Sequence, residues 1–389
     1  MKTIHKIGLI PIVFLVLFTR CEKEPEPEIE FVVISDNAFR DALIELGVDN
    51  NGDGEICTSE AARVHSIDVS KRDISDMNGI EAFINLDTLN CSGNLLSTLD
   101  ISNHTLKYCN CSDNQLITLN VSDCSKLAYL RCSGNQLSTL DLSNNHNLFE
   151  VYCDGNNLSG LHLSSSTYFW TISCTSNQLT SLNVSNVSVI KLLCGNNPLS
   201  SLDVSQNTNL STLSCSHTLL GSLDVSNNIY LRNLACNYLQ LSSLDISNND
   251  DLWSLSVDGN QLSTLDVSGK TGLEILYCNH NQLTNLDVSE NTLLRHFRCR
   301  NNQLSSLDIS NNLALTDIDF GGNNFTSLDI SNNTNLGTNL VWESIPGIIL
   351  DSIPTLFEVC VWEMPFPPEG VEIEISGSPN LYFTTDCSK

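Results

Sequence analysis

Apolar residues return along this chain at a fixed interval, with the same spacing at each return. From residue 86 to residue 330 the text L-x-x-L-x-C-S-x-N-x-L-x-x-L-D-V-S-x-N recurs, with some replacements. Between Cys91 and Phe320 the cysteine column advances by nine steps of 21 residues and two of 20. The pattern predicts one short strand per unit, followed by turns. One unit cannot bury its apolar side alone, so we expect stacked units that share a continuous core.

Three polar or thiol columns accompany this repeat. The cysteines are expected to point inward as small apolar groups, although neighbouring thiols would be close enough to bridge. A metal ladder is not expected, because no histidine column accompanies them. The asparagine three residues later is expected to hydrogen-bond the backbone of adjacent units, with a local irregularity where Thr218 and Leu239 replace it. The stacked aspartates predict either Asx-type bonds to nearby backbone N–H groups or a cation ladder. Cys109 and Cys124 lie off the column and have no assigned role.

The repeat resembles the leucine-rich repeat, with cysteine in the third leucine position of L-x-x-L-x-L, over roughly residues 74–341. It is most similar to internalin-like bacterial surface proteins. The resemblance implies a β-rich α/β solenoid with rungs of about 21 residues and a parallel sheet on the concave face. We expect a small helical cap at residues 31–73 and a second cap at residues 342–389.

The first twenty residues are typical of a signal peptide. A basic start is followed by an apolar run from Ile7 to Phe18, which is too short to span a bilayer. Cys21 follows directly and resembles the acylated cysteine of bacterial lipoproteins, although Arg20 departs from that family's pattern. Residues 21–30 are acidic and proline-rich, as in a solvated tether. We therefore expect an exported protein at the outer membrane or cell surface, anchored by lipid at Cys21, with ordinary cleavage and release as the alternative.

The predicted N-terminal cap contains a candidate calcium site. Residues 34–47 predict a helix capped by Ser35 or Asp36 and ended by Gly47. The next segment fits the twelve-residue EF-hand loop, in which Gly54 permits the turn and Cys57 departs from the pattern. The expected ligands are Asp49, Asn51, Asp53, the backbone carbonyl of Glu55, and Glu60. The calcium would be structural; the alternative is an Asx-rich turn without metal.

The C-terminal segment departs from the repeat. It is richer in proline and aromatic residues, and the alternation from Val371 to Ile375 predicts a strand. Cys360 and Cys387 lie outside the cysteine column and are the expected disulfide pair. A sorting signal is the alternative to a cap.

Binding residues are expected at the variable positions of each strand, which lie four, three and one residues before the cysteine column. These 36 positions hold six of the nine Lys and Arg residues found between 86 and 330, and seven aromatic residues, including Phe149. Tyr, Trp and Arg are the residue types that anchor interfaces. The candidate ligand-binding residues are Tyr108, Tyr129, Arg131, Tyr152, Trp170, Lys191, Arg232, Trp253, Tyr277, Arg295 and Arg298.

Charge and motifs exclude several classes of function. A net charge of −27 is incompatible with the basic surface that nucleic-acid binding requires. The eight histidines share no column, and the sequence has no G-x-S-x-G, H-E-x-x-H or phosphate-loop motif. We expect a non-catalytic, monomeric surface protein that binds an extracellular protein, as the internalin resemblance implies. The alternatives are capture of polysaccharide or a structural role in the envelope.

Overall fold

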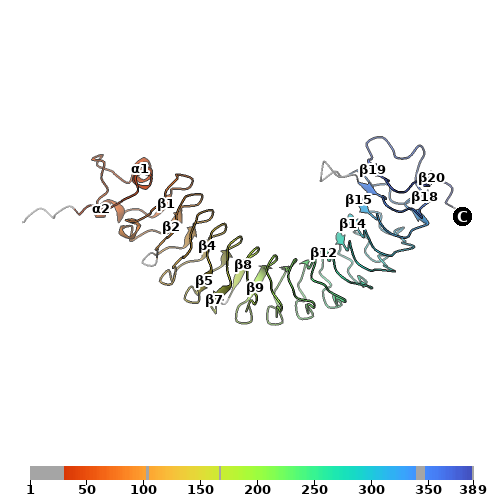
Figure 1. Ribbon diagram of the computed structural model, residues 1–389, viewed down its shortest axis with the longest axis horizontal. Helices are drawn as coiled ribbons and strands as arrows, with labels where there is room; N and C mark the ends of the chain where they lie inside the picture. Colours follow the sequence, from red (N-terminus) through yellow and green to blue (C-terminus); the bar gives the residue numbers. More distant parts are fainter. Residues whose placement is uncertain (1–29, 102–104, 166–167, 339–346, 388–389) are drawn as a thin grey trace, which may run out of the picture.

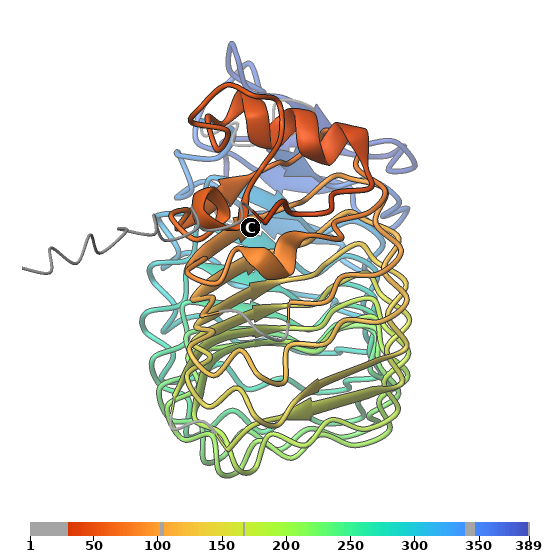
Figure 2. The same ribbon diagram turned by 90° about the vertical axis from the view of Figure 1, so that its left-hand side faces the viewer.

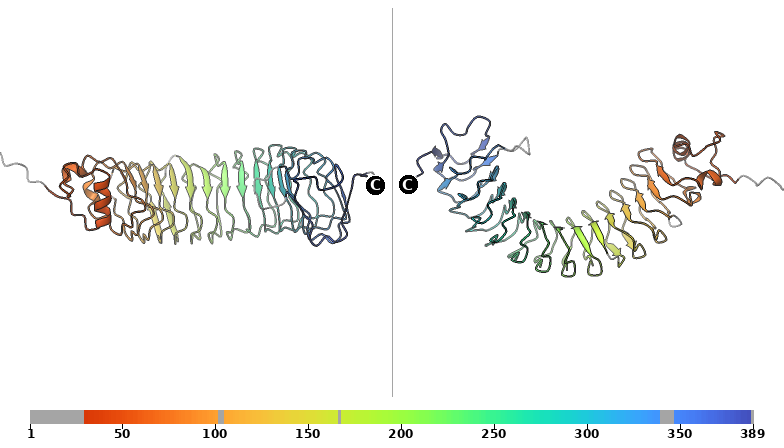
Figure 3. Two further views of the ribbon diagram at one scale, coloured as in Figure 1. Left: turned by 90° about the horizontal axis from the view of Figure 1, so that it is seen from above. Right: turned by 180° about the vertical axis from the view of Figure 1, so that it is seen from behind.

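The computed structural model describes residues 30–101, 105–165, 168–338 and 347–387. Its main element is a parallel sheet of fifteen strands whose order follows the chain. The sheet lines the concave side of a crescent, and the outer turns lie on the convex side (Figure 1). Seen from above, the strands lie side by side along the whole length (Figure 3). The predicted leucine-rich-repeat solenoid with a concave parallel sheet is confirmed.

The strands of this sheet are β1 (Ser66–Asp68), β2 (Thr88–Asn90), β3 (Tyr108–Asn110), β4 (Tyr129–Arg131), β6 (Glu150–Tyr152), β8 (Phe169–Ser173), β9 (Val189–Leu193), β10 (Thr212–Ser214), β11 (Asn233–Ala235), β12 (Ser254–Ser256), β13 (Ile275–Tyr277), β14 (His296–Arg298), β15 (Asp317–Asp319), β17 (Ile348–Ile349) and β19 (Ile373–Glu374). Two smaller sheets contain β5 (Thr139–Leu142) with β7 (Gly160–Leu163), and β16 (Ser327–Asp329) with β18 (Glu358–Cys360) and β20 (Tyr382–Thr384). The helical elements are α1 (Asn37–Glu45), α2 (Thr58–Ala61) and the 3-10 turn η1 (Ile80–Ala82).

Side chains alternate between the core and the concave surface along each strand. In β4 the central Leu130 is buried, whereas Tyr129 and Arg131 point outward. The cysteine after each strand faces inward, and all ten column thiols are fully buried and unbridged, as predicted. Burial raises the pKa of the Cys174 thiol to about 12, so this thiol stays protonated at neutral pH. The column thus contributes small apolar groups to the core.

The two cysteines without an assigned role occupy scaffold positions. Cys109 takes the place of the central buried leucine in β3 and pairs with Leu89 and Leu130 on the neighbouring strands. Cys124 lies in the turn, where its Sγ donates a hydrogen bond to the carbonyl of Ile101 at 3.0 Å. Both thiols are fully buried.

The asparagine column joins each coil to its neighbour. Asn156 donates from Nδ2 to the carbonyls of Cys132 and Cys153, at 3.0 and 3.1 Å. Its Oδ1 accepts the N–H of Leu137 at 3.1 Å. Such bonds satisfy backbone groups that the turn would otherwise leave buried and unpaired.

The irregularity expected at Thr218 and Leu239 is confined to the turn, where Gln240 has a φ of 63° that the equivalent described residues of the other coils do not share. Strands β10, β11 and β12 pair in unbroken register. Thr218 Oγ1 donates to the carbonyl of Cys215 at 2.9 Å, replacing one bond of the missing amide. Asn260 in the next coil accepts the N–H groups of both Leu239 and Leu241. Neighbouring polar groups therefore replace part of what the two missing amides would bond, and the strands stay in register while the turn backbone changes.

A second buried asparagine column lies in the turns that follow the aspartates. Asn207 is typical: its Nδ2 donates to the carbonyls of Val184 and Val187 at 3.1 and 2.8 Å. Cys124 and Lys270 stand in this column in place of asparagine. Lys270 is almost fully buried, and its Nζ lies 2.8 Å from Asp250 and 3.3 Å from the carbonyl of Ser247. The Lys270 side chain thus bonds the preceding coil, as the Asn207 amide does at the equivalent position of its own coil.

The aspartate column forms the Asx-type bonds that were one of its two predicted roles. Asp224, Asp245 and Asp266 each accept the N–H of the serine two residues later, at 2.9 Å. Hydrogen bonds from this serine lower the pKa of each of these carboxyl groups. Asn183, in the same column, makes the equivalent bond to Ser185, which shows that an acceptor rather than a negative charge is what the turn requires.

These bonds predict how acid affects the solenoid. A carboxyl group whose pKa is lower in the folded state stabilises that state above the pKa of the unfolded chain, and this stabilisation is lost as pH falls through the folded value. We expect the melting temperature to be flat from about pH 7 to about pH 5 and to fall below about pH 4. Replacing Asp224, Asp245 and Asp266 with asparagine keeps the acceptors and removes three titrating groups. Thermal scans should then show a weaker acid-induced fall; an unchanged or steeper fall would contradict this account.

The helical cap closes the N-terminal end of the coil stack, where α1 lies across the first coils (Figure 2). Asp36 is the N-cap of α1, and its Oδ1 accepts the N–H of Phe39 at 3.0 Å. Its Oδ2 accepts the N–H and the hydroxyl of Ser75 and the N–H of Asp76. One carboxylate therefore both starts the helix and holds it to the repeats.

The repeating sheet extends past both predicted boundaries of the solenoid. Strand β1 pairs with β2 although it precedes residue 74. After residue 341, β17 and β19 continue the concave sheet, and β18 and β20 continue the sheet begun by β16. The predicted strand at Val371–Ile375 corresponds to β19. The C-terminal segment thus adds coils to the stack, with longer and less regular turns than the 21-residue rungs.

Candidate functional site

Five aromatic side chains form one continuous line across the concave face, which we call the aromatic strip. Its ring centroids are 6.4 Å apart between Tyr108 and Tyr129, and 5.9 Å between Tyr129 and Phe149. Phe149 then stacks with Tyr168 at 5.8 Å and with Trp170 at 6.2 Å. Because parallel strands are about 4.8 Å apart, residues in one outward column come into contact across neighbouring coils. The strip therefore runs along the solenoid axis from β3 to β8.

Two cations cover rings at this strip and beside it. The Arg131 guanidinium lies 5.1 Å from the centroid of Tyr152, and Lys191 Nζ lies 5.5 Å from the centroid of Trp170. Such contacts hold the cation in place while its charge remains partly available to a ligand. Trp170 is thus packed between Phe149 and Lys191, yet it is 39% exposed.

Arg232 and Trp253 lie beyond the strip, near the middle of the crescent. Both are exposed on the concave side, and the backbone N–H of Trp253 donates to the carbonyl of Arg232. In the part of the chain that the structure describes, no ring or cation lies against the Trp253 side chain. The structure therefore separates these two predicted residues from the strip.

The predicted residues near the C-terminal end of the face are engaged in ion pairs. Arg298 Nε and Nη2 each lie 3.1 Å from a carboxylate oxygen of Asp317, and its guanidinium stacks 5.2 Å from the Tyr277 centroid. Arg295 Nε lies 3.2 Å from Glu274. The charge of each arginine is therefore balanced within the fold, and neither is a free cation for a ligand.

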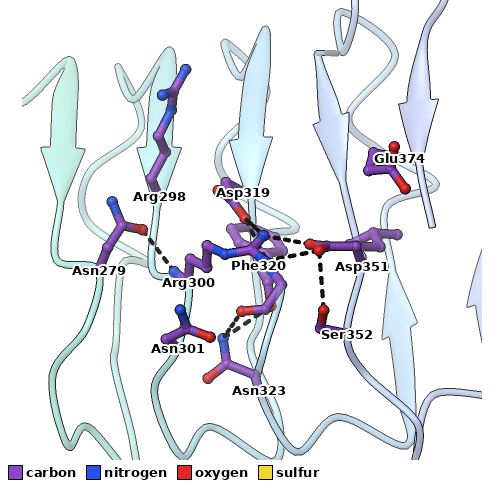
Figure 4. Close-up of polar contacts among 12 residues, drawn as sticks. Asn279, Arg298, Arg300, Asn301, Asp319, Phe320, Asn323, Asp351, Ser352 and Glu374 are labelled. Atoms are coloured by element: carbon purple, nitrogen blue, oxygen red, sulfur yellow. Dashed lines mark hydrogen bonds and ion pairs between the residues drawn. The ribbon is translucent and has the colours of Figure 1, made fainter. Parts of the chain in front are cut away.

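A further ion-pair cluster lies beside this region and joins the last coils (Figure 4). Arg300 makes a two-pronged contact with Asp351, with Nη2 2.8 Å from Oδ2, and its Nη1 lies 3.4 Å from Asp319. Hydrogen bonding to Arg300 lowers the pKa of Asp351, whereas burial raises that of Asp319. Arg298 points away from this cluster. We assign the cluster a structural role, because it ties β15 to the coil that follows β17.

Sequence reasoning missed two members of the strip as binding residues. Phe149 occupies an expected surface position but was not among the candidate residues. Tyr168 lies outside the three surface columns, one residue before the position of the repeat's first leucine. The sequence signal that could have identified Tyr168 is the run Tyr168-Phe169-Trp170, because three successive aromatic residues occur in no other repeat.

The predicted calcium loop is closed by hydrogen bonds from its own backbone. Asp49 accepts the N–H groups of Gly52 and Gly54, and Glu60 accepts those of Asn50 and Cys57. These bonds lower the pKa of both carboxyl groups, so both are ionised at neutral pH, as a hard cation requires. Within the described residues, three of the loop's carboxylates do not converge within 4.8 Å. The donor set fits calcium, but coordination would require the loop to tighten.

The comparisons with known proteins identify the family. No protein-family model matches the chain, and no curated protein matches it. Among solved structures, the functional domain of InlJ from Listeria monocytogenes, described as including a cysteine ladder, is 30% identical, with a TM-score of 0.66. The match covers 78% of this chain and 74% of that one. The chain belongs to the internalin-like leucine-rich-repeat proteins.

Other internalin-like and leucine-rich-repeat structures share the fold. An internalin of Listeria monocytogenes, InlF, is 15% identical over 93% of this chain and 98% of its own, with a TM-score of 0.58. YopM, a leucine-rich effector protein of Yersinia pestis, is 21% identical over 87% and 98%, with a TM-score of 0.61. At these identities the likeness concerns the fold alone.

Two other features of this internalin-like protein are a disulfide bond and the character of its helices. Cys360 and Cys387 are disulfide-bonded, with their Cα atoms 5.5 Å apart, and join β18 to the chain end beyond β20. The thiols of this pair and Asp329 are close together, but the disulfide occupies both sulfurs. None of the described helices is long and apolar enough to cross a membrane. The predicted lipidation site, Cys21, lies outside the described residues.

Proposed function

We propose that this internalin-like protein is an exported, lipid-anchored and non-catalytic binding protein. Its N-terminal concave surface, from β3 to β9, would hold an extracellular protein partner. The observation that carries this proposal is the aromatic strip, a contiguous row of partly exposed rings flanked by Arg131 and Lys191. Exposed aromatic residues beside arginine are typical of the centres of protein interfaces. The crescent provides a surface concave enough to surround a partner (Figure 3).

The packing of the rings favours a protein over a glycan on the strip. Sugar rings stack on open aromatic faces. Here Phe149 and Lys191 cover Trp170, while Tyr129 packs between Tyr108 and Phe149. Because the rings meet at tilted, edge-on and stacked angles, the strip presents both ring faces and ring edges rather than one flat, open platform. Apolar side chains of a protein can pack against such edges without needing a flat platform.

The test is binding of residues 22–389 to an array of extracellular proteins and glycans, followed by one substitution. Trp170→Ala should weaken binding of a protein partner about thirtyfold or more, because truncating an aromatic residue that anchors the centre of an interface costs about 2 kcal/mol or more. Phe357→Ala is the matched control, since Phe357 is also exposed but precedes β18, away from the concave sheet. Equal binding by both variants, measured by biolayer interferometry, would exclude the strip as the site.

Glycan capture is the second candidate, favoured by one observation. Trp253 is 43% exposed and has an uncovered ring among the described residues, as sugar stacking requires. If the array yields only polysaccharides, Trp253→Ala should abolish their binding while Trp170→Ala leaves it intact. The reverse pattern would exclude this candidate.

Calcium in the cap loop is proposed as a structural component. Asp49, Asn51, Asp53, the carbonyl of Glu55, and Glu60 would be its ligands. The ionised, backbone-anchored carboxylates of Asp49 and Glu60 support this proposal. The ion would fasten the cap over the first coils and take no part in partner binding.

Calcium should therefore raise the stability of the folded chain. At a hundredfold excess over its Kd, the gain is expected to be about 2.7 kcal/mol, since the ion binds only the folded loop. Glu60→Gln should remove most of this gain in scans with calcium and with chelator. Glu55→Gln is the control, because Glu55 would contribute only its backbone carbonyl. No calcium-dependent shift in the native chain would rule out the site.

A further inference from the structure

The charges of the concave face differ from those of the rest of the molecule. The chain has a net charge of −27 with only eighteen Lys and Arg residues. On the outward strand positions from β4 to β11, however, three cations accompany a single carboxylate, Glu150. The three are Arg131, Lys191 and Arg232, which we call the free cations, because none has a carboxylate within 4 Å among the described residues.

Among the described cations of the concave face, those without a carboxylate partner all lie in its middle part. Lys107 lies 3.1 Å from Asp87, Arg295 is paired with Glu274, and Arg298 with Asp317. Two of the free cations are instead held against aromatic rings, which orient them without neutralising them.

The spacing of the free cations fits an extended chain. From β4 to β11 there are five steps between paired strands, or roughly 24 Å at about 4.8 Å per step. An extended peptide rises about 3.3 Å per residue, so roughly seven residues would span this distance. Arg131 and Lys191 lie beside the aromatic strip, so the same segment could place an apolar side chain on the strip.

We propose that the partner segment bound by this face is an acidic, extended peptide stretch that also carries an apolar or aromatic side chain. Its carboxylates would pair with Arg131, Lys191 and Arg232, and its apolar side chain would pack against the strip. This inference rests on the proposed function and names the chemistry of the partner. The negative charge elsewhere on the protein repels acidic chains, so encounter with such a segment is directed to the concave face.

A random glutamate–tyrosine copolymer is the probe, with a lysine–tyrosine copolymer and the polyuronate alginate as comparisons. The face variant combines Arg131→Gln, Lys191→Gln and Arg232→Gln. Its matched control combines Arg63→Gln, Lys71→Gln and Lys126→Gln, three exposed cations outside the outward strand positions, with the same change in net charge. We expect residues 22–389 to bind the glutamate–tyrosine copolymer, and binding to weaken at least tenfold in the face variant but less than twofold in the control. Raising the salt concentration from about 0.05 to about 0.3 M should weaken binding of the copolymer to the native chain by at least about tenfold as well, because salt screens the charge pairs.

Three results would overturn the proposal: no binding of the glutamate–tyrosine copolymer, equal loss in both triple variants, or stronger binding of alginate or of the lysine–tyrosine copolymer. Circular dichroism and thermal scans of each variant show whether it is folded. A failure of the proposed function can be told apart from a failure of this inference by two further outcomes. If a protein from the array binds and is lost with Trp170→Ala but not with the face variant, the binding face stands and the acidic partner is wrong. If neither variant affects that protein, the face itself is wrong.

Discussion

Asn156→Ala is expected to lower the free energy of unfolding by about 3 kcal/mol. The substitution removes the three bonds that Nδ2 donates, to the carbonyls of Cys132, Cys153 and Asp154, and the one that Oδ1 accepts. It leaves the N–H of Leu137 buried without its acceptor, whereas the carbonyls of Cys132 and Cys153 each lose one of two amide donors. The effect exceeds that of an ordinary hydrogen bond because four backbone groups in adjacent coils lose the same side chain, and a buried N–H without an acceptor is costly.

The adjacent Asn157 is the matched control for this prediction. It is the same residue type, but its side chain is exposed. Asn157→Ala should change stability by less than about 0.5 kcal/mol. Urea unfolding followed by circular dichroism would measure both variants. Similar losses in the two variants, or a loss below about 1 kcal/mol for Asn156→Ala, would show that the ladder does not hold the coils together.

Arg300→Ala is expected to destabilise the C-terminal coils by about 3 kcal/mol. Arg300 contacts both Asp319 and Asp351, and each of these carboxylates has a side chain that is only 13% exposed. Without the guanidinium, two partly buried negative charges would face each other unpaired, which is costlier than losing an exposed pair. The ion-pair cluster is also closely packed: a Cβ atom added at Gly321 would collide with the side chains of both Asp351 and Arg300.

Arg295→Ala is the control for Arg300, because the Arg295 side chain is 51% exposed in its pair with Glu274. An exposed pair of this kind contributes less than about 1 kcal/mol. Hydrogen exchange should show faster exchange in residues 347–375 for Arg300→Ala and native rates for Arg295→Ala. Neighbouring coils stabilise each other chiefly through their shared interface, so exchange near β4 should not change. Uniform acceleration along the chain would contradict a local role.

The N-terminal cap shows how far local patterns reach. The helix, its N-cap at Asp36 and its end near Gly47 follow from residues within a few positions of one another. The contact of Asp36 with Ser75 does not, because the two residues meet only when the cap folds onto the first coil. The same limit applies to Cys124 and Lys270, whose partners lie on the preceding coil.

The candidate site illustrates this limit for function. The outward columns were predictable, because strand alternation and a constant period determine which side chains face the concave surface. Which of their charged side chains form ion pairs was not predictable. Arg131 and Arg298 occupy equivalent positions in the repeat, yet among the described residues Arg298 meets a carboxylate, Asp317 on the next strand, and Arg131 meets none. Likewise, Trp170 and Trp253 occupy equivalent positions, but within the described ranges aromatic rings contact Trp170 and none contacts Trp253.

From the sequence alone came the solenoid, its period, the buried thiol column, the asparagine ladder and the concave sheet. Each follows from a spacing of about 21 residues, which stacks every column on itself and makes contacts across coils follow from position in the repeat. Only the tertiary structure decided where the sheet ends, which cations stay free, and how Tyr168 completes the aromatic strip. These features depend on the particular side chains that meet across neighbouring coils and on turns that leave the period, so packing in three dimensions, not spacing along the chain, determines them.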